Sequence, residues 1–110
     1  MKRELMKKIN AQCYELFDYA LSEFYFIADQ KGIRLNSCKA WVYETEHFFI
    51  LQSYNTIVAC IEKKSDVLVD VLRTEFGYTA TSAQHIAKFS RKYGSGKFGC
   101  TLKFTAYPVD

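Results

Sequence analysis

Proline and glycine are scarce in this sequence, and long apolar runs are missing. One Pro and five Gly among 110 residues indicate a compact chain with short connections. No apolar run approaches the roughly 20 residues that span a bilayer. The charged start MKRELMKKIN has no apolar segment of the kind found in secretory signals. We therefore expect a cytoplasmic protein that does not contact a membrane.

Short motifs of common active sites are also absent. The sequence contains no G-x-x-x-x-G-K-[ST], G-x-G-x-x-G, H-E-x-x-H or G-x-S-x-G. Residues 94–97, GSGK, look faintly like a phosphate loop, but they follow a predicted helix and lead into a predicted strand. That is the reverse of the order that such loops need. We expect no enzymatic activity and no cofactor; an enzyme is an alternative that no motif supports.

The four cysteines, Cys13, Cys38, Cys60 and Cys100, include no C-x-x-C pair. Structural zinc sites draw their ligands in such close pairs, so the spacing argues against a bound metal. Each cysteine also takes a position where an apolar side chain is expected. We interpret all four as reduced, small core residues.

The composition predicts one globular domain over residues 1–110. Apolar residues make up 49% and aromatic residues 16%, which is enough apolar surface to offset the entropy of ordering the chain. The net charge of +3 is unevenly placed, because residues 1–8 and residues 81–110 are both basic and the centre is mildly acidic. That asymmetry permits an anionic partner.

The hydrophobic pattern predicts an α+β fold. Apolar residues recur every three or four positions from Leu5 to Ala28, which indicates a helix of about seven turns that Gly32 would stop. The aromatic side chains of this helix spread beyond one stripe. Either the helix is buried on two sides or a second subunit covers part of it, and we expect a homodimer.

Alternating patterns follow the first helix. Residues 39–43, 48–53, 56–61 and 67–72 read as strands whose short connections predict an antiparallel meander. Residues 81–84 match a capping box, with Thr81 as the cap, and begin a second helix that ends at Gly94. Residues 98–107 alternate as a last strand. The predicted order is α-β-β-β-β-α-β, an antiparallel sheet of four to five strands with both helices on one face.

Tyr54 and Asn55 form the polar tip of the predicted hairpin between residues 53 and 56. Asn tolerates the positive φ that such a turn requires, so Asn55 is the expected site of that conformation. An exposed Tyr with hydrogen-bonding neighbours is a common recognition device. The alternatives are a partner-binding tip or turn chemistry alone, with Tyr54 lying back on the sheet.

The second helix is basic. His85, Lys88 and Lys92 share one predicted helix face and Arg91 flanks it, so the positive groups could meet phosphates or carboxylates. The same pattern is typical of a solvated outer face opposite an apolar one. Tyr54, Asn55, His85, Lys88, Arg91 and Lys92 are therefore the candidate partner-binding residues.

Two further features are weaker candidates for a functional site. His47 lies beside Glu44 and Glu46, but a turn between strands rarely provides a cleft, so we interpret these as solvated turn residues. Asp70 alternates with apolar residues in a predicted strand. It requires a basic partner, or else its face of the sheet is only partly covered.

The segments SYNTIVA at residues 53–59 and TATSAQHIAKF at residues 79–89 resemble a pattern in small uncharacterised proteins of gut bacteria, their phages and mobile elements. The resemblance covers roughly residues 47–94 and implies a mobile-element accessory protein. Phage chains of this size without catalytic motifs often bind host machinery, and some inhibit CRISPR nucleases. The expectation is a binding protein directed at a host protein or ribonucleoprotein complex. The alternative is a small DNA- or RNA-binding protein that uses the basic helix.

Overall fold

The computed structural model describes residues 2–27, 32–35 and 38–108 and confirms the α+β class. Its helices and strands are α1 (Lys2–Phe26), β1 (Ile33–Arg34), β2 (Ala40–Glu44), β3 (Phe48–Ser53), β4 (Thr56–Glu62), β5 (Val67–Asp70), α2 (Leu72–Glu75), α3 (Ala80–Tyr93) and β6 (Leu102–Thr105). The strands form one sheet in the order β1-β2-β3-β4-β5-β6. No helix in the described ranges is both long enough and apolar enough to cross a membrane.

The sheet has six strands and is mixed, which corrects the prediction of an antiparallel sheet of four to five strands. The first five strands pair antiparallel, but β6 runs parallel to β5, with Val67 opposite Leu102 and Asp70 opposite Thr105. Short connections explain the antiparallel part. The segment between β5 and β6 contains two helices and is long enough for the crossover that a parallel pair requires.

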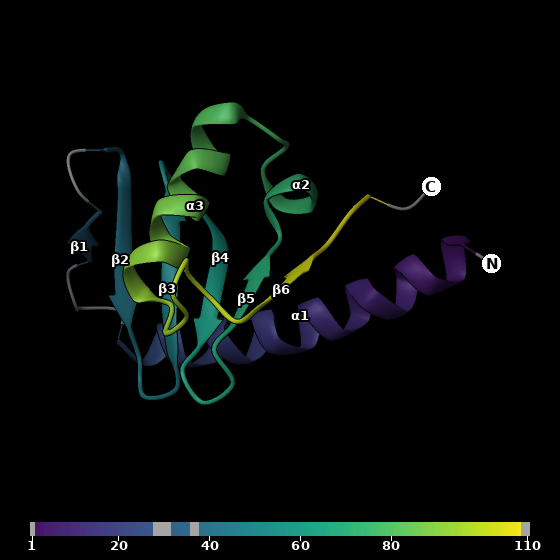
Figure 1. Ribbon diagram of the computed structural model, residues 1–110, viewed down its shortest axis with the longest axis horizontal. Helices are drawn as coiled ribbons and strands as arrows, with labels where there is room; N and C mark the ends of the chain where they lie inside the picture. The colour runs from purple at the N-terminus through teal and green to yellow at the C-terminus, as the bar shows by residue number, and fades with distance from the viewer. Residues whose placement is uncertain (1, 28–31, 36–37, 109–110) are drawn as a thin grey trace.

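The helices cover both faces of the sheet, which corrects the prediction of one covered face. Figure 1 shows α3 on the near side of the sheet and α1 on the far side. Phe89 of α3 belongs to the same buried cluster as Leu51, whereas Phe17 of α1 packs in a second cluster with Ile50. All four residues of β5 are buried, as expected for a strand that is covered on both sides.

The long first helix is confirmed, with Cys13, Phe17 and Ala20 as its buried stripe. It ends at Phe26, before the predicted stop at Gly32. Residues 28–31, which the prediction also placed in this helix, lie outside the described residues.

The second predicted helix is α3, and its cap lies two residues earlier than predicted. The Thr79 hydroxyl, and not that of Thr81, accepts a hydrogen bond from the Ser82 amide at 3.1 Å. Thr81 is already helical. The predicted end at Gly94 is confirmed, and a Cβ there would lie 2.4 Å from the Cys100 amide nitrogen. Glycine is therefore required by the close approach of the chain that returns to β6.

Two of the four cysteines occupy the core positions that the sequence predicted, and the other two pack against the core. Cys13 and Cys60 are buried, Cys38 and Cys100 are half-buried, and all four are free thiols. Burial raises the pKa of the Cys60 thiol, which keeps it protonated. Among the described residues, no three His, Cys, Asp or Glu side chains are placed to hold a metal ion.

Candidate functional site: the α3 face and a tyrosine-lined cavity

Residues 79–108, which run from the cap of α3 through β6, contain five cations and no acidic residue. Arg91 and Lys92 are exposed on α3 and Lys88 is half-buried. Within the described chain none of these three forms an ion pair. The outer side of α3 is therefore a basic surface whose charges are not neutralised by neighbours.

His85 does not belong to that outer surface, which corrects the predicted grouping with Lys88 and Lys92. Its side chain is buried, and Nδ1 lies 2.8 Å from the Ser53 hydroxyl of β3. Ser53 in turn donates to the Ser82 hydroxyl at 3.0 Å. The reason is the register of α3, because residues 82, 85, 86 and 89 make one inward stripe at helical spacing.

This buried Ser–His contact does not form an accessible nucleophile. Ser53 is fully buried, so a substrate cannot reach its hydroxyl in this structure. Burial, together with the nearby charge of Lys88, lowers the pKa of His85, so the ring is neutral at neutral pH. His85 therefore joins α3 to the sheet through neutral hydrogen bonds.

The hairpin tip lies against this histidine. Tyr54 keeps 39% of its surface exposed, and its ring centre is 5.7 Å from that of His85. The positive φ of the turn is at Tyr54 (55°), which corrects its prediction at Asn55. The two-residue turn between Ser53 and Thr56 requires a positive φ at its first central residue, which is Tyr54. The exposed Asn55 and the outer edge of Tyr54 thus lie beside the N-terminal half of α3.

The structure brings the candidate residues into two groups on one side of the molecule. Tyr54 and Asn55 lie beside His85, which supports the tip from beneath. Arg91 and Lys92 lie about two helical turns further along α3, roughly 10 Å away along its axis. Lys88 lies between the groups. A partner must cover both turns of the helix to contact all of them.

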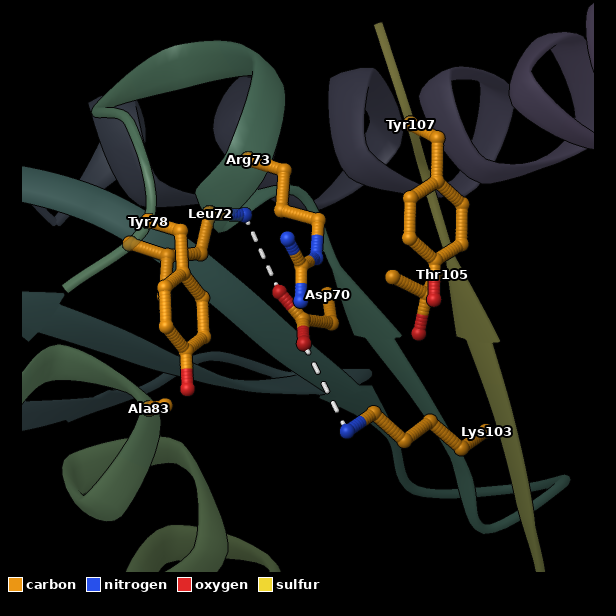
Figure 2. Close-up of a pocket in the computed structure, with 8 residues that line it drawn as sticks. All are labelled: Asp70, Leu72, Arg73, Tyr78, Ala83, Lys103, Thr105 and Tyr107. Carbon is orange, nitrogen blue, oxygen red and sulfur yellow. Dashed lines mark hydrogen bonds and ion pairs between the residues drawn. The ribbon is translucent and has the colours of Figure 1, made fainter. Parts of the chain in front are cut away.

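A second feature, which the sequence did not reveal, is a cavity of about 230 Å³ beside β6. It lies where α2, the start of α3 and the β5–β6 edge meet (Figure 2). Its lining residues are Asp70, Leu72, Arg73, Tyr78, Ala83, Lys103, Thr105 and Tyr107. The cavity exists because α3 covers the middle of the sheet and leaves this edge only partly covered.

Arg73 is the central cation of the cavity. Its guanidinium lies 4.4 Å from the ring centre of Tyr78 and 5.3 Å from that of Tyr107. Figure 2 shows the guanidinium between the two rings. Tyr78 precedes α3 in the sequence and Tyr107 follows it. Such cation–π contacts hold the planar group in one orientation.

Asp70 and Lys103 form the floor of the cavity. One oxygen of Asp70 accepts a hydrogen bond from the Leu72 amide at 3.0 Å, and the other lies 3.5 Å from the Lys103 ammonium. Of the two alternatives inferred from the sequence, the structure shows the first, because Asp70 has Lys103 as a basic partner. The Lys103 side chain keeps about half of its surface exposed and can reach other anions.

The family model described as a family of unknown function (DUF8033) matches residues 10–105. The chain belongs to the DUF8033 family. The match includes every strand of the sheet, α3 and the cavity lining up to Thr105. No curated protein and no solved structure matches the chain.

Within this DUF8033 fold, the turn that contains Glu44, Glu46 and His47 is exposed, as predicted, but it is not isolated. The Glu23 carboxylate of α1 contacts the His47 imidazole at 2.5 Å and also accepts a hydrogen bond from Thr45 at 2.6 Å. The hydrogen bond that the His47 ring donates to the Glu23 carboxylate raises the pKa of His47. The contact fastens α1 to the β2–β3 turn, and Glu46 lies 3.9 Å from the other ring nitrogen of His47.

Proposed function

We propose that this protein is a non-enzymatic binding protein of phage or mobile-element type that acts in the cytoplasm on a host protein or ribonucleoprotein complex. A defence complex such as a CRISPR nuclease is the kind of target that the resemblance of SYNTIVA and TATSAQHIAKF to mobile-element proteins favours. The single observation that carries the binding role is the outer side of α3, whose exposed cations form no ion pair with any described residue.

Uncompensated charge of one sign supports association with an acidic surface. Like charges on one helix repel one another, so the arrangement costs stability unless a partner neutralises it. Tyr54 adds an aromatic edge beside these cations, and its turn is tied down by a hydrogen bond from Gln52 to the Tyr54 carbonyl at 2.8 Å. A rigid aromatic group next to a charged helix provides contact area at little entropic cost.

Direct binding to DNA or RNA is the second candidate. The acid-free stretch of residues 79–108 favours it, because phosphate contacts by Lys and Arg supply most of the affinity of nucleic-acid proteins. Such binding weakens steeply as salt rises, whereas a protein interface with an apolar centre tolerates salt better.

Capture from host lysate, with and without nuclease treatment, separates the two candidates. The proposal expects one host protein or complex to be retained after nuclease treatment and at raised salt. Loss of every captured partner after nuclease treatment, together with a steep salt dependence, would instead assign the α3 face to nucleic acid.

A further inference from the structure

The cavity beside β6 gathers hydrogen-bond donors around one space. Arg73 and Lys103 line it together with the hydroxyl-bearing side chains of Tyr78, Thr105 and Tyr107 (Figure 2). Asp70 is the one carboxylate among the lining residues. The lining therefore carries a net positive charge and offers more donors than acceptors.

Arg73 is positioned while its donors remain free. The rings of Tyr78 and Tyr107 contact the guanidinium, and no described residue forms a hydrogen bond or ion pair with its N–H groups. A guanidinium that is stacked on aromatic rings keeps its fork of N–H groups in a fixed geometry. That fork matches two oxygens of a carboxylate or phosphate.

Asp70 does not cancel the preference of the cavity for an anion. Its two oxygens are already engaged, one by the Leu72 amide and the other by Lys103. The carboxylate is mostly buried, whereas the Lys103 side chain is 54% exposed. Asp70 thus holds the ammonium group beside the cavity, and that ammonium can turn toward an anion that enters.

The size and the number of donors decide which anion fits. A volume of about 230 Å³ lies below the range of roughly 300–1,000 Å³ that is typical of sites for drug-sized ligands. A small anion is therefore indicated. A carboxylate would use both of its oxygens on the Arg73 fork, whereas a phosphate has further oxygens for Lys103 and the hydroxyl groups.

We propose that this cavity binds the phosphate group of free phosphate or of a small phosphate ester. Arg73 binds two of its oxygens, and Lys103 binds a third from the β6 side. The site goes beyond the partner-binding role of the α3 face and does not depend on it, because the lining includes none of the residues assigned to that face.

The test is calorimetric titration of the full chain with inorganic phosphate, glycerol 3-phosphate and acetate. Binding to Arg73→Gln is expected to be at least about tenfold weaker for both phosphate compounds, since a charge-assisted bidentate contact is lost. Lys103→Gln should weaken binding as well. Asp70→Asn should bind phosphate as tightly as the wild type or more tightly, because Asn keeps an acceptor for Leu72 and removes a negative charge.

Lys97→Gln is the matched control, because it removes an equal charge from the same acid-free segment outside the cavity. It should leave phosphate binding within about twofold of the wild type. Circular dichroism checks that each variant folds. Lys103→Gln keeps the test decisive if Arg73→Gln does not fold, because that side chain is half exposed.

Three results would overturn the proposal. The first is no phosphate binding at millimolar concentration, and the second is acetate binding as tight as that of phosphate. The third is equal weakening by Lys97→Gln and the cavity variants, which would mean general charge attraction. Binding of glycerol 3-phosphate that is tighter than that of free phosphate would support the proposal and identify an ester as the source; equal binding would support free phosphate.

Discussion

Replacing Asp66 tests how the returning chain is fastened to the sheet. Asp66 lies in the turn before β5 with a φ of 57°, and its carboxylate accepts three hydrogen bonds. They come from the Ser95 amide at 2.8 Å, the Thr101 amide at 2.8 Å and the Thr101 hydroxyl at 2.6 Å. One side chain thus holds both ends of the connection between α3 and β6.

The contribution of these hydrogen bonds to stability follows from the pKa of the Asp66 carboxyl group. Burial alone would raise that pKa, but the hydrogen bonds from Thr101 and Ser95 outweigh it and lower the pKa from 3.8 to about 2. Because the folded pKa is the lower one, the stabilisation is fully present above the unfolded value near 3.8 and is lost as the pH falls through about 2. After a discount for solvent screening at this loop, the contribution is about 1–2 kcal/mol.

Asp66→Asn is the suitable change, because Asn also tolerates a positive φ and has nearly the same shape. We expect the free energy of unfolding to fall by about 1–2 kcal/mol at neutral pH. The difference from the wild type should shrink as the pH falls below about 4. Urea unfolding followed by circular dichroism at a series of pH values measures this. The control is Asp18→Asn, an exposed aspartate of α1.

A difference between wild type and Asp66→Asn that stays constant from neutral to acidic pH would refute this reasoning. So would an Asp66→Asn variant that is as stable as Asp18→Asn at neutral pH. Either result would mean that the hydrogen bonds to Asp66 do not favour its charged form.

Three further outcomes follow from the fold. Phe89→Ala should lower the free energy of unfolding by about 3–5 kcal/mol in urea melts, because the Phe89 ring is fully buried between α3 and the sheet; a loss below about 1 kcal/mol would contradict this packing. Denaturing thiol titration should find four free thiols and metal analysis no bound zinc; a stoichiometric metal would revive an enzymatic function. Light scattering should detect a dimer that Phe26→Asp weakens, since Tyr25 and Phe26 are 69% and 92% exposed on α1; a monomer at high micromolar concentration would exclude it.

Local patterns predicted the local elements well. The α1 stripe, the β3 strand at residues 48–53 and the Gly94 stop all depend on neighbouring residues, and the structure confirms them. The direction of β6 depends on a long crossover, so short-range turn reasoning gave the wrong sheet type. Residues 58–61 of β4 are four consecutive apolar residues, and all four are buried. This unbroken apolar run was the sign in the sequence that both faces of the sheet are covered.

The candidate site was predicted only in part, for a similar reason. Lys88, Arg91 and Lys92 lie on the outer side of α3, but His85 lies one turn before Phe89 on the buried stripe of the helix and therefore points inward. The cavity joins Arg73, Tyr78 and Tyr107, whose meeting depends on the placement of α2 and β6. Asp70 was its one visible sign in the sequence, as a carboxylate that lacked an evident partner.

Charge reversal on α3 tests the central proposal most directly. Lys88→Glu combined with Arg91→Glu changes the surface potential on the side opposite Phe89, and the matched control is Lys7→Glu combined with Lys8→Glu on α1. Quantitative capture of the partner, with thermal melts to confirm folding, is the measurement. The proposal predicts that the α3 variant folds but loses the partner while the α1 variant retains it. Normal binding by the folded α3 variant would contradict the proposal and make the basic side of α3 a solvated face.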